Sequence, residues 1–291
     1  MTPSHALDVA AGKARTLVEA LPYIRSYRGQ TVVVKVGGAA LDDPHLATLV
    51  ADDLTLLALV GLRLVVVHGG GPQVSGAMSA AGIEPTFVGG LRVTDESSME
   101  LVQQVLVGRI NSDLVARLCA TGMSAVGLSG FDGDLVRAQR IGGPSGEDLG
   151  RVGSVVEVKP RLLASLLDDS YTPVIASVAP DADGAALNVN ADAVAGAVAG
   201  AIDAAKLVYL TNVEGLYADL GDSGSLVSEV KATELAELVP GLSDGMRPKV
   251  TSALDALHSG VGKVHVLDGR IPHALLLEIF TDEGIGTQVL P

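Results

Sequence analysis

Short runs of β-branched residues alternate along this chain with segments of helical periodicity. The runs TVVVKV (Thr31–Val36) and RLVVVH (Arg63–His68) are largely apolar on both sides, which is typical of strands buried on both faces. Further strands are expected at 125–129, 172–179, 206–211 and 263–267, and helices at 43–59, 72–81, 95–119, 161–168, 192–202, 232–238 and 247–260. This alternation predicts an α/β fold in which helices cover both faces of a parallel sheet.

Two segments stand outside the alternation. Residues 135–158 read as strands around a glycine-rich turn, which predicts an antiparallel excursion. Ahead of the first strand, an amphipathic helix is expected to begin at a Ser4 cap and end at Pro22. Its apolar positions recur at spacings of three and four: Leu7, Ala10, Ala14, Leu17, Val18 and Leu21. A helix of this length is marginal in isolation, so its apolar face needs a partner.

The charge balance narrows the range of partners. The chain has 34 acidic and 20 basic residues and a net charge of −14, so neither nucleic acid nor an anionic membrane is an expected partner. The single cysteine, Cys119, excludes a disulfide framework and is expected to pack in the core. No segment reads as a secretion signal or a membrane span, so a cytoplasmic location is expected.

Glycine-rich loops follow the first two predicted strands. Lys35 leads into Gly37-Gly38, and His68, expected to be structural, leads into Gly69-Gly70-Gly71-Pro72. Each loop presents backbone N–H groups at the start of a helix, where anions bind. Two such loops in successive strand–helix units, the first with a lysine at the strand end, predict an anion site at the carboxyl edge of the sheet.

Other readings of these glycines fit less well. The dinucleotide motif G-x-G-x-x-G would need glycine at Val74, and a P-loop before Lys263 would need glycine at Leu257. A hydrolase reading has some support, because His-Gly-Gly-Gly can supply oxyanion N–H groups and residues 241–245 match G-x-S-x-G. However, a nucleophile elbow follows a strand, and the preceding residues 232–239 read as a helix.

Further polar residues occupy other predicted loops. Arg92 in GGLRVTD suits bidentate binding of a carboxylate, although a surface salt bridge is an equal alternative. Asp192 and Asn190 precede a helix, where either one alone reads most simply as its N-cap. Lys249 near a helix start opposes the helix dipole, which favours a ligand-binding role. Gly215 is either a turn residue or part of a nucleotide pocket.

Seven segments, in order and spacing, resemble the amino-acid kinase family over nearly the whole chain. They are VVVKVGGAAL, VVVHGGGPQV, FVGGLRVTD, NVNADAVAGAVA, KLVYLTNVEGLY, DGMRPKV and HALLLEIFTDEGIGT. The chain is most similar to the arginine-sensitive branch that phosphorylates the γ-carboxylate of N-acetyl-L-glutamate in arginine biosynthesis. The resemblance implies an open αβα sandwich preceded by an N-terminal amphipathic helix. It also implies that residues 1–24 make oligomer contacts, that the lobe 25–180 binds the acyl amino acid, and that the lobe 181–291 binds ATP.

The resemblance also assigns roles to residues. Lys35 and Lys249 would stabilise the transition state, and Asp192 would organise both lysines. N-acetylglutamate would be held by Gly70, Gly71, Arg92 and Asn188. ATP, accompanied by Mg²⁺, would be bound by Gly37, Gly38, Thr211, Val213, Gly215, Leu216, Tyr217 and Met246, and no protein ligand to the metal is assigned. Asp244 stands where the family often has glycine, and its effect near ATP is left open.

Regulation by arginine follows from the same resemblance. In that branch the N-terminal helix interlaces with that of another dimer, which implies a hexamer built as a trimer of dimers. Arginine would inhibit by binding between this helix and the C-terminal lobe. The matching positions are His265, Glu278, Gly284 and Tyr23.

Residue chemistry agrees with a kinase that acts on a carboxylate. A γ-carboxylate with an ordinary pKa of about 4.3 is already ionised at neutral pH, so the reaction needs charge stabilisation rather than a general base. Two alternatives remain: a kinase for a related N-blocked amino acid, such as an aminoadipate derivative, and a catalytically silent amino-acid or nucleotide sensor. The presence of both Lys35 and Lys249 argues against the sensor.

Overall fold

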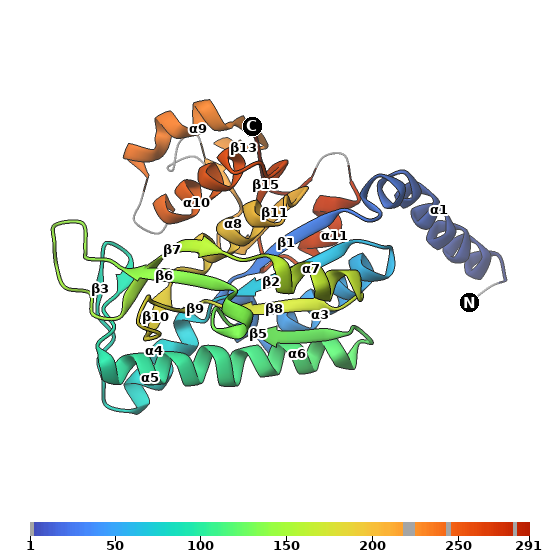
Figure 1. The fold of residues 1–291 in the computed structure, drawn as a ribbon. Helices are drawn as coiled ribbons and strands as arrows, with labels where there is room; N and C mark the ends of the chain where they lie inside the picture. Colours follow the sequence, from blue (N-terminus) through green and yellow to red (C-terminus); the bar gives the residue numbers. More distant parts are fainter. Residues whose placement is uncertain (1–2, 218–224, 243–245, 282–283) are drawn as a thin grey trace.

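An eight-stranded sheet forms the centre of the molecule (Figure 1). The structure is a computed structural model that describes residues 3–217, 225–242, 246–281 and 284–291. In spatial order the strands are β14 (Glu229–Lys231), β16 (Thr287–Leu290), β15 (Lys263–Asp268), β11 (Lys206–Thr211), β1 (Thr31–Val36), β2 (Arg63–His68), β8 (Thr172–Ala176) and β5 (Ala125–Leu128). Neighbours pair in parallel except β15 and β16, which confirms the mainly parallel sheet.

Helices cover both faces of this sheet because alternate strand residues point to opposite sides. On β1, Val33 joins a core that includes residues of α8 (Ala191–Ala201) and α10 (Arg247–His258). Val32 and Val34 join the opposite core, with residues of α3 (Pro44–Leu59), α6 (Asn111–Ala120) and α11 (Ala274–Ile279). The αβα sandwich is therefore confirmed, and Figure 1 shows α8 and α3 on opposite sides of β1.

A second sheet contains the predicted antiparallel excursion. Its order is β6 (Val136–Arg140), β7 (Val152–Val158), β10 (Ala186–Val189) and β9 (Val178–Pro180), and β6 pairs antiparallel with β7. The single strand predicted at 172–179 is wrong. The chain leaves the central sheet after β8, passes Ser177, and enters the second sheet as β9, where it pairs with β10.

The helix predicted at 95–119 contains a change of helical type. It consists of α5 (Glu96–Gln103), a π-helical segment η1 (Gln104–Ile110) and α6. Asp95 caps its start by accepting a hydrogen bond from the Ser98 backbone N at 2.7 Å. Apolar periodicity predicts the extent of the helix but not the wider π turn.

Shorter elements complete the fold. They are α2 (Gly38–Asp42), α4 (Gly71–Ala80), β3 (Phe87–Val88), β4 (Leu91–Arg92), η2 (Asp132–Asp134), α7 (Arg161–Asp168), β12 (Leu216–Tyr217), β13 (Leu226–Val227), α9 (Ala232–Leu238) and η4 (Val239–Gly241). The helical segments α9 and η4, rather than a strand, precede residues 241–245, which argues against a nucleophile elbow. Ser243 and Asp244 lie outside the described residues.

The N-terminal helix α1 (Pro3–Tyr27) projects away from the sheets (Figure 1). The prediction that it ends at Pro22 is wrong: the helix tolerates the missing proline N–H and continues to Tyr27, whose ring lies 4.4 Å from Lys206 Nζ. The side chains of residues 3–10, and so the Ser4 cap, lie outside the description. On the described part of α1, the apolar side chains of Leu17 and Val18 are 70% and 63% exposed.

Two further observations concern the surface. Cys119 was expected in the core but is exposed, because α6 buries Leu114 and Leu118 instead. Among the residues that the structure describes, no helix combines the length and apolar character needed to cross a membrane.

Candidate active site

The loops after β1, β2 and β11 meet at the carboxyl edge of the central sheet. These three strands are parallel neighbours, so their ends lie side by side. The Gly37 N donates to the Leu210 carbonyl at 2.9 Å, which joins the end of β1 to the end of β11. The chain leaves β1 toward β2 on one side and returns at β11 on the other, an arrangement that opens a ligand crevice in α/β sheets.

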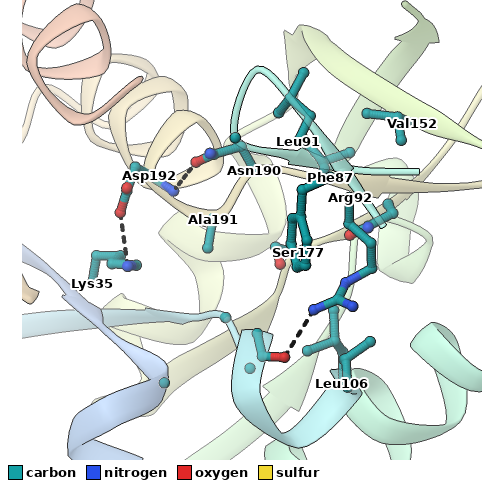
Figure 2. Close-up of a pocket in the computed structure, with 18 of the residues that line it drawn as sticks. Lys35, Phe87, Leu91, Arg92, Leu106, Val152, Ser177, Asn190, Ala191 and Asp192 are labelled. Atoms are coloured by element: carbon teal, nitrogen blue, oxygen red, sulfur yellow. Dashed lines mark hydrogen bonds and ion pairs between the residues drawn. The ribbon is translucent and has the colours of Figure 1, made fainter. Parts of the chain in front are cut away.

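A cavity of about 250 Å³ lies at this edge. Eight residues assigned from the sequence line it: Lys35, Gly38, Gly70, Gly71, Arg92, Asn188, Asp192 and Lys249. In Figure 2, Lys35 and Asp192 stand at one side, Arg92 at the other, and Phe87 and Ser177 between them. The sequence therefore identified a set of residues, distant in the chain, that the fold brings to one cavity.

A charged triad, Lys35–Asp192–Lys249, forms one wall. Lys35 Nζ lies 2.8 Å from Asp192 Oδ1, and Lys249 Nζ lies 2.7 Å from Oδ2. Burial alone would raise the pKa of Asp192, but the two ammonium groups hold it below its ordinary value. Burial lowers the pKa of Lys35, and the Asp192 carboxylate opposes that shift. With all three groups ionised, the triad has one excess positive charge facing the cavity.

Helix capping explains why Asp192 is available to the lysines. Asn190 is the N-cap of α8, and its Oδ1 accepts from Asp192 N at 2.8 Å and from Ala193 N at 3.3 Å. Asn190 therefore takes the capping role that the sequence left open between two residues. Lys249 lies in the first turn of α10, as predicted, and points at Asp192 across the helix pair.

The glycines of the first two loops allow close backbone approach. A Cβ on Gly70 would lie 2.2 Å from Ile110 Cδ1, and a Cβ on Gly38 would lie 2.8 Å from Pro72 Cδ. Side chains are thus excluded by packing at both positions. The backbone itself lines this part of the cavity, as an anion site built from N–H groups requires.

His68 supports the second loop from beneath. Its Nδ1 lies 3.0 Å from the Gly69 carbonyl, and its Nε2 lies 3.0 Å from Asn111 Nδ2, which also donates to the Val174 carbonyl. A neutral imidazole with the proton on Nδ1 satisfies both contacts. Burial lowers the pKa of His68 to about 4, which agrees with this neutral form and with a structural role.

Arg92 lies on β4 and is largely buried rather than part of a surface salt bridge. Its Nη2 donates to the Gly71 carbonyl at 2.9 Å and to Ser75 Oγ at 2.8 Å. The Phe87 ring covers the guanidinium at 4.6 Å. Asn188 Nδ2 donates to Thr94 Oγ1 at 3.2 Å, and that hydroxyl donates to the Arg92 carbonyl at 2.9 Å. The guanidinium is therefore held in place before any ligand arrives.

Most of the residues assigned to nucleotide binding do not line this cavity. Gly38 lines the cavity, and Gly37 and Thr211 lie beside it at the ends of β1 and β11. Val213, Leu216 and Met246 belong to or pack against the core beneath α10. Gly215 packs against Thr287, and the Tyr217 hydroxyl donates to Glu214.

Three residues assigned to an arginine site meet beside the middle of β15. His265 Nδ1 lies 2.5 Å from Glu278 Oε1, and Glu278 Oε2 accepts from Ile285 N at 2.9 Å. A Cβ on Gly284 would lie 2.8 Å from Glu278 Oε2. Burial would raise the pKa of Glu278, but His265 and the Ile285 N–H lower it. Tyr23, the fourth residue, lies on α1.

Sequence reasoning did not identify several lining residues. Phe87 lies on β3, just before a hairpin turn in which Gly89 and Gly90 have positive φ, and FVGG is a recognisable turn signal. Ser177 lies where the chain passes between the two sheets, and Leu106 lies in the π segment. Neither of the last two carries a local signal, because tertiary structure decides both positions.

The side chains at the cavity can be tested for their ability to hold the expected Mg²⁺. Within the described residues, no group of three or more His, Cys, Asp or Glu side chains has a metal-binding arrangement. Both oxygens of Asp192 already contact lysines. Magnesium is commonly held by substrate phosphates and water with few protein ligands, so an ion that arrives with a nucleotide fits this cavity.

Comparisons with known proteins agree with the geometry. A model described as the amino acid kinase family matches residues 30–268. The acetylglutamate kinase of Acidothermus cellulolyticus is 50% identical, covering 99% of this chain and 100% of its own length. That of Symbiobacterium thermophilum is 51% identical, covering 97% and 98%.

Solved structures extend the similarity. N-acetylglutamate synthase from Neisseria gonorrhoeae, complexed with coenzyme A and N-acetyl-glutamate, matches with a TM-score of 0.85 and 32% identity over 96% of this chain. The same synthase complexed with coenzyme A and L-arginine matches with a TM-score of 0.81 and 30% identity over 95%. This chain covers 63% and 65% of those two chains.

Proposed function

This chain is a kinase that belongs to the amino acid kinase family, and we propose that it transfers the γ-phosphoryl group of ATP to the γ-carboxylate of N-acetyl-L-glutamate in arginine biosynthesis. The observation that carries the proposal is the charged triad at one side of the cavity with Arg92 at the other. The full-length similarity to acetylglutamate kinases supports the choice of acceptor.

The reaction forms one bond and breaks one. An oxygen of the acceptor carboxylate bonds to the γ-phosphorus, and the bond from that phosphorus to the β–γ bridging oxygen breaks to release ADP. No base is needed, because the carboxylate is already ionised at neutral pH. The protein contributes position and charge: the excess cation of Lys35 and Lys249 meets the negative charge on the transferring group. Mg²⁺ bound with ATP would neutralise further phosphate charge.

The other end of the acceptor meets groups suited to hold it. Arg92 would pair with the α-carboxylate, and the backbone N–H groups of Gly70 and Gly71, with Asn188, would bind the remaining polar atoms. ATP would lie beyond Gly37 and Gly38. The rest of the nucleotide set would border it: Thr211, Val213, Gly215, Leu216, Tyr217 and Met246.

Regulation and assembly form the finer part of the proposal. Arginine would bind near His265, Glu278, Gly284 and Tyr23, and the match to a synthase complexed with L-arginine supports this. The exposed apolar face of α1 supports a contact with a second copy, within a hexamer of three dimers. The division into lobes at residue 180 and a cytoplasmic location stay predictions.

An ADP-release assay with ATP and Mg²⁺ tests the proposed function. Turnover with N-acetylglutamate should exceed turnover with free glutamate and with N-acetylaminoadipate. Preference for the aminoadipate derivative would reassign the acceptor. If none of the three acceptors stimulates ADP release while ATP binds, the proposed function is contradicted and the sensor alternative is favoured.

A further inference from the structure

Asp192 on α8 is attached to α10 at two different points. Its carboxylate Oδ2 accepts from Lys249 Nζ at 2.7 Å, and its backbone carbonyl accepts from Ser252 Oγ at 2.6 Å. Lys249 and Ser252 are three residues apart, so they lie on one face of α10. Because the two contacts are one turn apart, they restrict both the rotation of α10 about its axis and its sliding past α8.

Tyr209 of β11 supports the second contact from the sheet. Its hydroxyl lies 2.7 Å from Ser252 Oγ and 3.4 Å from the Asp192 carbonyl. Because Ser252 gives its only hydroxyl proton to Asp192, the phenol donates to Ser252. Burial raises the pKa of Tyr209 well above its ordinary value, and the Asp192 charge adds to this, so the phenol stays a donor.

Gly196 makes room for this arrangement. It lies one turn after Asp192 on α8, and a Cβ there would lie 2.6 Å from Ser252 Oγ and 3.5 Å from the Tyr209 hydroxyl. Tyr209 is completely buried, and Ser252 is 5% exposed. Both hydroxyl-bearing side chains are therefore almost fully removed from solvent. In such an interior a hydrogen bond is electrostatically stronger than at the surface.

We propose that Tyr209 and Ser252, here called the hydroxyl bridge, position Lys249 against Asp192 before substrates bind. Neither residue lines the cavity, so both are positioning residues that act through Lys249. The inference rests on the proposed function for the role of Lys249 in phosphoryl transfer. It adds a connection from the central sheet, through two hydroxyls, to the lysine that meets the transferring group.

The first experiment compares variants that remove single hydroxyls. Tyr209→Phe keeps the buried ring and should lower kcat about tenfold, with KM for ATP and for acetylglutamate changed less than about twofold. Ser252→Ala should have at least as large an effect, because it breaks the contact to Asp192 directly. Thr55→Val is the matched control: it removes the partly buried Thr55–Thr121 hydroxyl pair, whose oxygens are 2.5 Å apart, and should leave kcat unchanged.

A double-mutant cycle separates positioning from general weakening of the fold. If the hydroxyl bridge acts through Lys249, Tyr209→Phe should lower kcat in the native chain but not in Lys249→Ala. The same fold-loss in both backgrounds would overturn the inference. So would an unchanged kcat in Tyr209→Phe.

A measurement without turnover keeps the two proposals distinguishable. Lysines labelled as ¹³C-dimethyl-lysine give NMR signals, and that of Lys249 is assigned from its loss in Lys249→Arg. Tyr209→Phe should shift this signal in the substrate-free protein, whereas Thr55→Val should not. If Tyr209→Phe leaves the Lys249 signal unchanged, the positioning role of the hydroxyl bridge is rejected, even when the native protein is an active kinase. A shifted signal in a protein without kinase activity supports the bridge while the proposed function fails.

Discussion

At the scale of single residues, Lys35 and Lys249 share one carboxylate while their charge is directed at the cavity. Lys35→Ala and Lys249→Ala should each lower kcat by about 10²-fold or more, because each removes a cation that meets charge developed in the transition state. KM for acetylglutamate should change less. Steady-state ADP release measures both quantities, and a Lys35→Ala enzyme with near-native kcat would exclude this residue from the mechanism.

Arg92 is expected to bind substrate rather than to act in the chemical step. Arg92→Lys keeps the positive charge but loses the planar fork that can bind a carboxylate with two parallel hydrogen bonds. KM for acetylglutamate should therefore rise more than KM for ATP. Equal changes in the two KM values would contradict the assignment.

His68 makes stability depend on pH. Its folded-state pKa, about 4, lies below the ordinary value of 6.5, so protons favour the unfolded chain as the pH falls through this window. The contribution of His68 to the free energy of unfolding is fully present above about pH 6.5, and about 3 kcal/mol of it is lost by pH 4. Urea unfolding of the native chain and of His68→Gln should show the two free energies converging across this range. Parallel curves would remove His68 as the cause.

At the scale of elements, α8 and α10 pack closely because α8 has glycines at positions 196 and 200. A Cβ on Gly200 would lie 2.6 Å from Ser259 Cβ, so Gly200→Ala should destabilise the protein by about 1–3 kcal/mol. Gly76→Ala is the matched control within helix α4, where nothing lies within 4 Å of the added Cβ. It should stabilise by about 0.5–1 kcal/mol. Chemical denaturation measures both, and changes of the same sign would contradict the packing argument.

These elements also differ in how well the sequence predicts them. Strands such as Thr31–Val36 were predicted to the residue, because buried β-branched runs carry a local signal. The triad was predicted from the family resemblance, and its lysine and aspartate types suit the chemistry. The π segment, the strand break at Ser177 and the hydroxyl bridge were not predicted, since each depends on packing between distant segments. Helix α1 was predicted, but it continues past Pro22 to Tyr27, and Gly29, which has a φ of 80°, follows its end.

At the scale of the whole molecule, α1 is the part that the sandwich does not need. Deletion of residues 1–24 should give smaller oligomers, expected to be dimers, that keep kinase activity but respond weakly to arginine. Exposed Leu17 and Val18 would no longer be available for contact with another copy. Sedimentation and arginine titration measure the two effects. A truncated protein with native assembly and native inhibition would leave α1 with no regulatory role.

The position of β1 between β2 and β11 has a consequence for how the chain folds. Val32 pairs with Leu64, which follows soon in the chain, and with Lys206, which is synthesised only after the whole second sheet. One edge of β1 therefore stays open while most of the protein is made, and an open apolar edge is a template for pairing with other chains. Contacts between such distant segments also slow folding. The strand that carries Lys35 thus keeps one edge unpaired until β11 has been synthesised.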